Sequence, residues 1–285
     1  MDPSSVETAS RAREDIVRIA AHMTSMGWAE ANAGNISVLL PAGLDDIWDG
    51  EVESEALPEP VTAMAGRTIM VTAAWSRFRR LYLDSERDIV PGRISADGTR
   101  LITFAGSRRP TSELSTHLLV MASALERGWE TVSLVHTHST SMLALSSSDL
   151  PGEMLEDAVL RAHPEVELLL PRGVRFLEYY TPGTWELGKA TAEAFAEKDC
   201  VVWRKHGILG LGKDIEAACD AVEVIEKAAR ILLLEKSAFG KFLGLKDREL
   251  MIAGEIPREV PEEERPEEDG GFVPPSVPEE TDQEI

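Results

Sequence analysis

Residues 132–138 read Val-Ser-Leu-Val-His-Thr-His, a short apolar run that ends in two histidines. The run is typical of a buried strand in both its length and its branched side chains. Side chains two positions apart on a strand lie on the same face, about 7 Å apart along the backbone. The imidazoles of His136 and His138 can therefore close on one ion where the strand bends or ends.

A third histidine, His206, follows a second apolar run, residues 200–203, and precedes Gly207. It is therefore also expected at the end of a strand. Three neutral histidines that hold an ion and leave one coordination position open are typical of a catalytic zinc site rather than a closed structural one. A histidine pair alone is a weak signal, because a histidine at a strand end is more often a polar residue with a satisfied hydrogen bond.

Two polar segments supply further candidates for this site. Residues 109–114, Arg-Pro-Thr-Ser-Glu-Leu, open a predicted helix with Thr111 or Ser112 as the N-cap. Glu113 then lies in the first turn, where the helix dipole favours a carboxylate, so that taken alone it could be an ordinary surface residue. Residues 32–37, Asn-Ala-Gly-Asn-Ile-Ser, form a predicted turn that leads into a strand.

Together these segments resemble the class II aldolase/adducin superfamily, and most closely its rhamnulose-1-phosphate aldolase branch. The matching stretches run in the family's order over most of residues 7–240 and comprise residues 27–35, 110–117, 134–138, 170–174, 181–184 and 202–207. The resemblance implies Zn²⁺, or another divalent transition metal ion, on His136, His138 and His206. It also implies that Glu113 acts as the general acid and base, and that the protein is a homotetramer with sites between subunits.

The resemblance further implies an aldehyde-lyase that cleaves a ketose 1-phosphate to dihydroxyacetone phosphate and an aldehyde. Five positions match residues that bind the substrate's phosphate in the family: Asn32, Gly34, Asn35, Thr111 and Ser112. The family usually has a further turn of the type Thr-Gly-Ser-Gly after a strand. Residues 71–77 read Val-Thr-Ala-Ala-Trp-Ser-Arg instead, so alanine and tryptophan replace the glycines. This departure leaves open which ketose is the substrate and whether it is phosphorylated.

A second acid or base is needed for the proton on the aldehyde oxygen. In the resembling branch a glutamate of the neighbouring subunit is a candidate, but the aligned residue here is Arg161, which cannot act as a base. Among nearby residues we favour Glu165. His117, four residues after Glu113 on the same predicted helix face, is expected to form hydrogen bonds within the site rather than to bind the ion.

Two other reactions fit the same pattern of residues. A sugar-phosphate 4-epimerase or a methylthioribulose-phosphate dehydratase would use the same metal site. A non-enzymatic scaffold of the adducin kind typically loses the metal ligands. The retention of the three histidines and Glu113 argues against a scaffold.

The chain has 285 residues and a formal net charge of −21, which argues against nucleic acid and anionic membranes as partners. Nearly half of this charge lies in residues 251–285, which contain twelve acidic residues, two arginines and six prolines. This composition predicts a disordered tail after a single domain, residues 1–250. Two cysteines indicate no disulfide framework, so we expect a cytoplasmic protein. The partner that the resemblance implies is a small sugar phosphate.

Periodicity and turn residues predict the remaining elements. The expected helices are residues 7–27, 111–127, 152–162, 184–198 and a long one from Asp214 to about residue 239. The expected strands are residues 35–40, 68–72, 89–95, 99–104, two strands around 171–173, then 200–203 and 208–211. Residues 41–66 are interpreted as a surface insertion. Strands in hairpin-like succession, flanked by helices, predict an α/β fold of three α/β/α layers with a mostly antiparallel central sheet.

Overall fold

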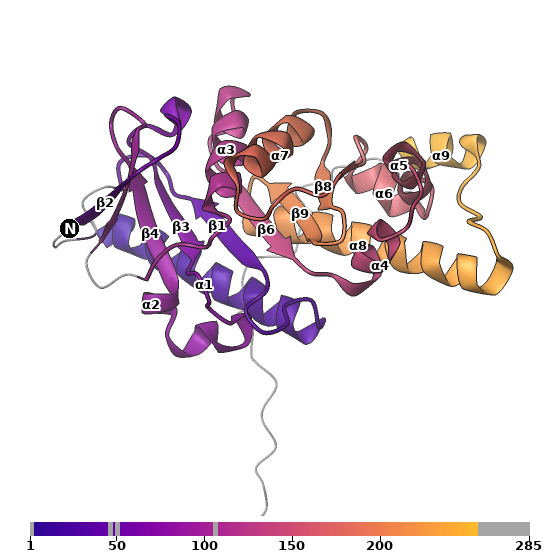
Figure 1. Cartoon of the computed structure of the whole chain (residues 1–285), viewed down its shortest axis with the longest axis horizontal. Helices are drawn as coiled ribbons and strands as arrows, with labels where there is room; N and C mark the ends of the chain where they lie inside the picture. The colour runs from indigo at the N-terminus through magenta and orange to yellow at the C-terminus, as the bar shows by residue number, and fades with distance from the viewer. Residues whose placement is uncertain (1–2, 45–47, 49–51, 105–107, 256–285) are drawn as a thin grey trace, which may run out of the picture.

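A mostly antiparallel sheet forms the centre of the protein in the computed structural model, which describes residues 3–44, 48, 52–104 and 108–255 (Figure 1). Its nine described strands lie in the order β2-β5-β4-β3-β1-β6-β9-β8-β7, and among them only β7 and β8 pair in parallel. The strands are β1 Asn35–Leu39, β2 Val52–Ala56, β3 Thr68–Thr72, β4 Ile89–Ile94, β5 Arg100–Phe104, β6 Ser133–Thr137, β7 Val174–Leu177, β8 Cys200–Trp203 and β9 Gly207–Gly212.

Helices cover both faces of this sheet. They are α1 Pro3–Ser25, α2 Ser85–Asp88, α3 Leu114–Glu126, α4 Thr140–Ser146, α5 Gly152–Leu160, α6 Pro164–Leu169, α7 Trp185–Glu197, α8 Ile215–Phe239 and α9 Asp247–Gly254, with 3-10 turns η1 Thr62–Met64 and η2 Phe78–Leu83. Helices α3 and α7 pack on one face with η1, whereas α1, α4, α5 and α8 pack on the other (Figure 1). The predicted three-layer α/β/α fold is confirmed.

The apolar runs that predicted β6 and β8 form strands whose side chains are buried on both faces of the sheet. Leu134 contributes to the core beneath α3 and α7, and its neighbour Val135 to the core beneath α1 and α8. In β8, Trp203 and Val202 divide in the same way. Because successive side chains of a strand point to opposite faces, a strand covered on both sides needs apolar residues at every position.

The pairing of these strands places their ends together. Both β6 and β8 pair antiparallel with β9, which lies between them, so β6 and β8 run in the same direction. The residues that follow β6 and β8 therefore reach the same edge of the sheet. This arrangement brings His138, which follows β6, close to His206, which follows β8, although they are 68 positions apart in the sequence.

Two predicted segments differ from the structure. Residues 41–66 contain β2, whose exposed side chains belong to an edge strand paired with β5, so the segment extends the sheet. The strand expected just before residue 171 is wrong, because residues 164–169 form α6, with Pro164 in its first turn. Proline at the start of a helix loses no hydrogen bond, and its fixed φ suits helical geometry. Only β7 follows this turn.

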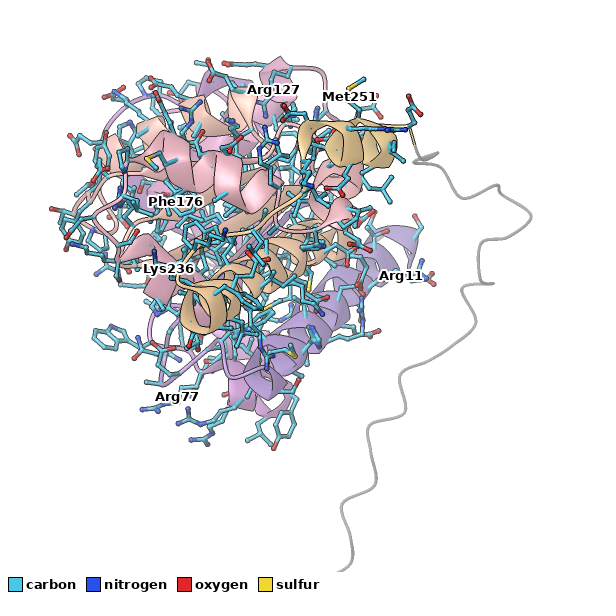
Figure 2. The ribbon with its side chains drawn as sticks, turned by 90° about the vertical axis from the view of Figure 1, so that its right-hand side faces the viewer. Arg11, Arg77, Arg127, Phe176, Lys236 and Met251 are labelled. Carbon is cyan, nitrogen blue, oxygen red and sulfur yellow. The ribbon has the colours of Figure 1, made fainter. Side chains whose placement is uncertain are left out.

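The predicted boundary of the acidic tail falls inside a helix. Helix α9 continues to Gly254, and its Ala253 is buried, although Met251 points outward (Figure 2). Residues 251–254 belong to this helix, and residues 256–285 of the predicted tail lie outside the described residues, so the predicted disorder of the tail stays a prediction. Within the part of the chain that the structure describes, no helix has the length and apolar character needed to cross a membrane.

Candidate metal centre

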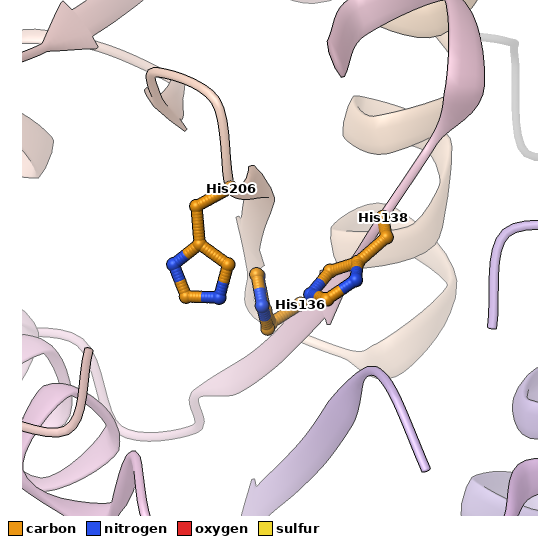
Figure 3. Close-up of side chains that lie close together, drawn as sticks. All are labelled: His136, His138 and His206. Atoms are coloured by element: carbon orange, nitrogen blue, oxygen red, sulfur yellow. The ribbon is translucent and has the colours of Figure 1, made fainter. Parts of the chain in front are cut away.

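Three imidazoles converge at the sheet edge where β6 and β8 end (Figure 3). One ring nitrogen from each of His136, His138 and His206 lies within 4.8 Å of those of the other two. The ring centroids are 5.1 to 5.3 Å apart. Zinc–nitrogen bonds are about 2.0–2.1 Å long, so ligand nitrogens around one tetrahedral ion lie about 3.4 Å apart, a spacing within reach of these side chains.

Hydrogen bonds to the other ring nitrogens direct the free lone pairs toward the shared space. Nδ1 of His136 donates to the carbonyl of Ile208 at 3.1 Å, and Nδ1 of His138 donates to a Glu30 carboxylate oxygen at 2.9 Å. Nε2 of His136 is buried and has no hydrogen-bond partner among the described residues. Such an unsatisfied group costs about 1–3 kcal/mol, a cost that coordination of a metal ion removes. The residues present therefore fit a divalent metal ion.

The surroundings keep the imidazoles of His136 and His206 neutral. The Trp203 ring lies 4.7 Å from that of His136 and 4.9 Å from that of His206, and its Nε1 donates to Thr191. Burial, reinforced by the neighbouring His136, lowers the pKa of His206 to about 4. Burial also lowers the pKa of His136 well below its usual value. Neutral imidazole is the form that binds a metal ion.

Glu113 completes the group. Helix α3 begins at Leu114, so Glu113 is its N-cap residue. The predicted N-cap at Thr111 or Ser112 is therefore wrong. The Thr111 hydroxyl accepts a hydrogen bond from the Glu113 backbone amide at 3.3 Å. The Glu113 carboxylate forms no capping bond. It is buried, with Oε2 3.4 Å from His136 Nε2 and Oε1 3.3 Å from His206 Nε2.

A chain of hydrogen bonds holds this carboxylate in place. The Asn35 side-chain amide donates to Glu113 Oε2 at 2.7 Å, and its own oxygen accepts from His117 Nε2 at 2.6 Å. The Ser37 hydroxyl lies 2.5 Å from His117 Nδ1 and donates to it, since Nε2 carries the ring proton. His117 thus forms hydrogen bonds within the site, as predicted. One of the two amide hydrogens of Asn35 is therefore used by Glu113, and the second has no hydrogen-bond partner among the described residues.

The other residues predicted to bind phosphate lie in two separate places. Asn32 is exposed in the turn before β1, and Gly34 has a φ of +85°, with its backbone close to the His136 carbonyl. Thr111 and Ser112 line a cavity of about 550 Å³ together with Arg108 and Arg109. The two arginines were missed in the sequence, although they directly precede the Pro-Thr-Ser-Glu segment.

The unusual turn after β3 retains the backbone of a glycine turn. Trp75 has a φ of +62°, a conformation that glycine favours, and its side chain is 77% exposed at the rim of the same cavity. The Ala74 amide donates to the Arg109 carbonyl, which ties the turn to the segment before α3. The altered residues therefore border the same cavity as Thr111 and Ser112.

Glu165 is not brought to the three histidines within one chain. It lies on α6, where its carboxylate is 2.6 Å from His163 Nδ1. The other ring nitrogen of His163 contacts the Val224 carbonyl of α8. A role in the reaction would require a neighbouring subunit to supply Glu165.

Comparison with known proteins decides the family. Residues 14–233 match the family described as Class II Aldolase and Adducin N-terminal domain. The chain belongs to this family. It is 31% identical over 255 residues to a rhamnulose-1-phosphate aldolase of Listeria welshimeri, covering 86% of this chain and 91% of that protein. It is 30% identical over 227 residues to the Enterococcus faecalis protein of the same name, covering 76% and 81%.

Solved structures agree with this membership. The crystal structure of a sugar-phosphate aldolase from Thermotoga maritima superposes with a TM-score of 0.72 at 33% identity, covering 81% of this chain and 97% of that one. An L-fuculose 1-phosphate aldolase has a TM-score of 0.60 at 23% identity, covering 86% and 95%, and supports the fold alone. The predicted family, fold class and enzyme class, a class II aldolase, are confirmed.

Gly207 is required by the close packing of this class II aldolase site. A Cβ at this position would lie 2.6 Å from His136 Cε1 and 2.7 Å from the Thr137 carbonyl oxygen. We expect Gly207→Ala to destabilise the protein by about 1–3 kcal/mol in urea unfolding and to weaken zinc binding, because β6 and β9 must separate. Gly152→Ala is the matched control, since its Cβ would meet nothing nearer than 3.5 Å. Equal effects of the two substitutions would contradict this explanation.

Glu30 orients His138 from outside the group of ligands. We expect Glu30→Gln to lower zinc affinity by about 10–100-fold, because the amide accepts a weaker hydrogen bond from Nδ1 and reduces the basicity of the ring. Zinc titration against a competing chelator measures the change. An unchanged affinity would show that the exposed Glu30 contact contributes nothing to the site.

The titration of His117 is expected to contribute to the pH dependence of the free energy of unfolding. Burial lowers the pKa of His117 from 6.5 to about 4. Between pH 6.5 and pH 4 the histidine is therefore protonated in the unfolded chain and neutral in the folded protein. Stability therefore falls as the pH drops from about 6.5 to 4. In urea unfolding of the metal-free protein at pH 7 and pH 5, His117→Gln should show a smaller loss than the wild type. An identical loss would mean that His117 does not titrate in this way.

Proposed function

We propose that the protein is a zinc-dependent aldehyde-lyase that cleaves a ketose 1-phosphate, of the rhamnulose 1-phosphate type, to dihydroxyacetone phosphate and an aldehyde. The convergence of three imidazoles beside the buried Glu113 carboxylate carries the proposal. Family membership and the names of relatives at 30% and 31% identity support it. The zinc ion, the phosphorylated substrate, the homotetramer and the cytoplasmic location are parts of this proposal.

His136, His138 and His206 would hold the ion through one ring nitrogen each. A bound divalent zinc ion supplies Lewis-acid stabilisation of the negative charge that develops on the ketone oxygen, which is worth several kcal/mol. The protein's own contribution is to fix the ring tautomers of two of these histidines. The carbonyl of Ile208 and the carboxylate of Glu30 perform this for His136 and His138.

Glu113 would manage the proton at carbon. In the cleavage direction the bond between C3 and C4 breaks, its electron pair stays on C3, and C4 leaves as the aldehyde. Glu113 then delivers a proton to C3, and in the reverse direction it removes that proton. The amide of Asn35, itself held by His117, keeps the carboxylate oriented for both tasks. Burial in a site with fixed donors avoids reorganisation during the reaction.

The hydroxyl proton on C4 needs a second acceptor. Glu165 of a neighbouring subunit is our candidate, because within one chain Glu165 contacts His163 and does not join the three histidines. This assignment depends on a homotetramer in which one subunit completes the site of the next. Glu165→Gln should then slow cleavage without loss of metal.

The anion of the substrate would lie in the cavity at the start of α3. Thr111 and Ser112 offer hydroxyl groups there, and Arg109 is exposed at its edge. Arg108 is committed to Asp88 at 2.8 Å and to the Ala74 carbonyl, so it fixes the cavity wall. Asn32 and the backbone around Gly34 remain candidates, although neither lines this cavity. A phosphate at a helix start is stabilised by the backbone N–H groups and the dipole.

Product analysis tests the proposal. The full-length zinc-loaded protein is incubated with rhamnulose 1-phosphate, other ketose 1-phosphates and the corresponding free ketoses. We expect equal amounts of dihydroxyacetone phosphate and aldehyde from a phosphorylated ketose, and much slower cleavage of the free sugars. An isomeric sugar phosphate or a dehydrated product would instead identify an epimerase or a dehydratase and contradict the proposal.

A further inference from the structure

A second group of metal-ligating side chains lies between α1 and α8 and shares no residue with the three catalytic histidines. We propose that His22, Cys219 and Glu223 form a second site for a divalent transition metal ion, with zinc as the preferred metal. One ligand atom from each residue lies within 4.8 Å of the other two. The group lies in the layer of α1 and α8, whereas Glu113 belongs to the opposite layer with α3.

The packing of the two helices creates this group. Cys219 and Glu223 are four residues apart on α8, so their side chains share one helix face. His22 lies in the last turn of α1. Ala20 of α1 and Val222 of α8 belong to the same buried core, which fixes the helices relative to one another. Figure 2 shows α1, marked by Arg11, and α8, marked by Lys236, on the same side of the molecule. The three ligand atoms are thus brought together by apolar packing.

The charge around the group favours a cation. Arg18 pairs with Glu216, and His22 contacts Glu223, but Asp220 lies between these acidic residues on α8. Glu216, Asp220 and Glu223 thus place three carboxylates on successive turns of α8, against the single guanidinium of Arg18. A divalent ion would compensate this excess, whereas the histidine alone carries at most one charge.

The ligand types select the metal. A thiolate, an imidazole and a carboxylate suit zinc and related transition metals, while magnesium and calcium prefer oxygen ligands alone. Three protein ligands leave one position for water, and the site would join the end of α1 to α8. The Cys219 thiol must lose its proton when it binds a metal ion. Binding to this site therefore weakens as the pH falls.

Cobalt(II) titration of the full-length protein tests the site, because a cobalt–thiolate bond gives a charge-transfer absorption band that the all-histidine group cannot give. We expect the band in the wild type and its loss in Cys219→Ser, with one metal equivalent fewer and unchanged aldol cleavage. His22→Gln should weaken cobalt binding at this site by about tenfold or more, since one of three ligands is removed. This half-buried position gives the same test if Cys219→Ser fails to fold.

Two controls separate this site from the catalytic one. The sequence contains one other cysteine, Cys200, whose thiol donates to the Leu209 carbonyl in the sheet, so Cys200→Ala should keep the band. His206→Ala should lose the catalytic metal and also keep the band, whatever reaction the protein performs. The absence of the band in the wild type, or its survival in Cys219→Ser, would overturn the proposal. His22 and Glu223 would then form only a hydrogen bond beside a buried thiol.

Discussion

Replacing His206 by alanine is expected to remove one metal equivalent and to lower kcat/KM by about a thousand-fold or more, since several kcal/mol of transition-state stabilisation depend on the ion. His206 is suited to this test because its side chain is 16% exposed and lies in a turn after β8. The substitution therefore removes a ligand without opening a large cavity in the core. His136 is less suitable, because its ring is fully buried against Trp203.

Metal analysis and steady-state kinetics on one preparation measure both effects. Lys205→Ala is the matched control, because Lys205 is the exposed neighbour of His206 and supplies no nitrogen to the group. It should retain the metal and most of the activity. Full metal content and full activity in His206→Ala would show that the third imidazole is not a ligand.

Replacing Glu113 by glutamine is expected to keep the metal and to lower kcat by about 10²–10⁴-fold, the usual contribution of a general acid or base. The amide has the shape of the carboxylate and its oxygen can still accept from Asn35, so the local structure should persist. Proton transfer at carbon is lost, because an amide neither takes up nor releases the proton.

Hydrogen exchange separates this role from a structural one. In heavy water the wild type should exchange one hydrogen at C3 of dihydroxyacetone phosphate in the absence of any aldehyde, a reaction that nuclear magnetic resonance follows directly. Glu113→Gln should exchange it far more slowly. Glu126→Gln makes the same chemical change at the exposed far end of α3 and should exchange normally. Undiminished exchange in Glu113→Gln would assign the proton transfer to another residue.

The histidine group was predictable because it follows from local pattern. The apolar runs before His136 and His206 identify two buried strands, and each histidine sits where its run ends. Glu113 was predictable only with the help of the family resemblance. Its burial between two imidazoles depends on how α3 packs on the sheet, which the sequence does not display.

Other features could not be read from one sequence for physical reasons. The link from Asn35 to Glu113 joins residues 78 positions apart, and it depends on the packing of α3 against β1. Residues 164–169 include a short apolar run that suits a helix or a strand equally, and the packing of α6 against α8 and α9 favours the helix. Edge strand β2 has no apolar alternation, because its described side chains face solvent.

Stepwise addition of zinc to the metal-free protein, with release of dihydroxyacetone phosphate from a ketose 1-phosphate measured at each step, tests the central claim most directly. We predict no cleavage without metal, a rise in activity that saturates when the histidine group is filled, and no recovery in His206→Ala at the same zinc concentration. Full activity in the metal-free protein would contradict a reaction that depends on an ion held by His136, His138 and His206.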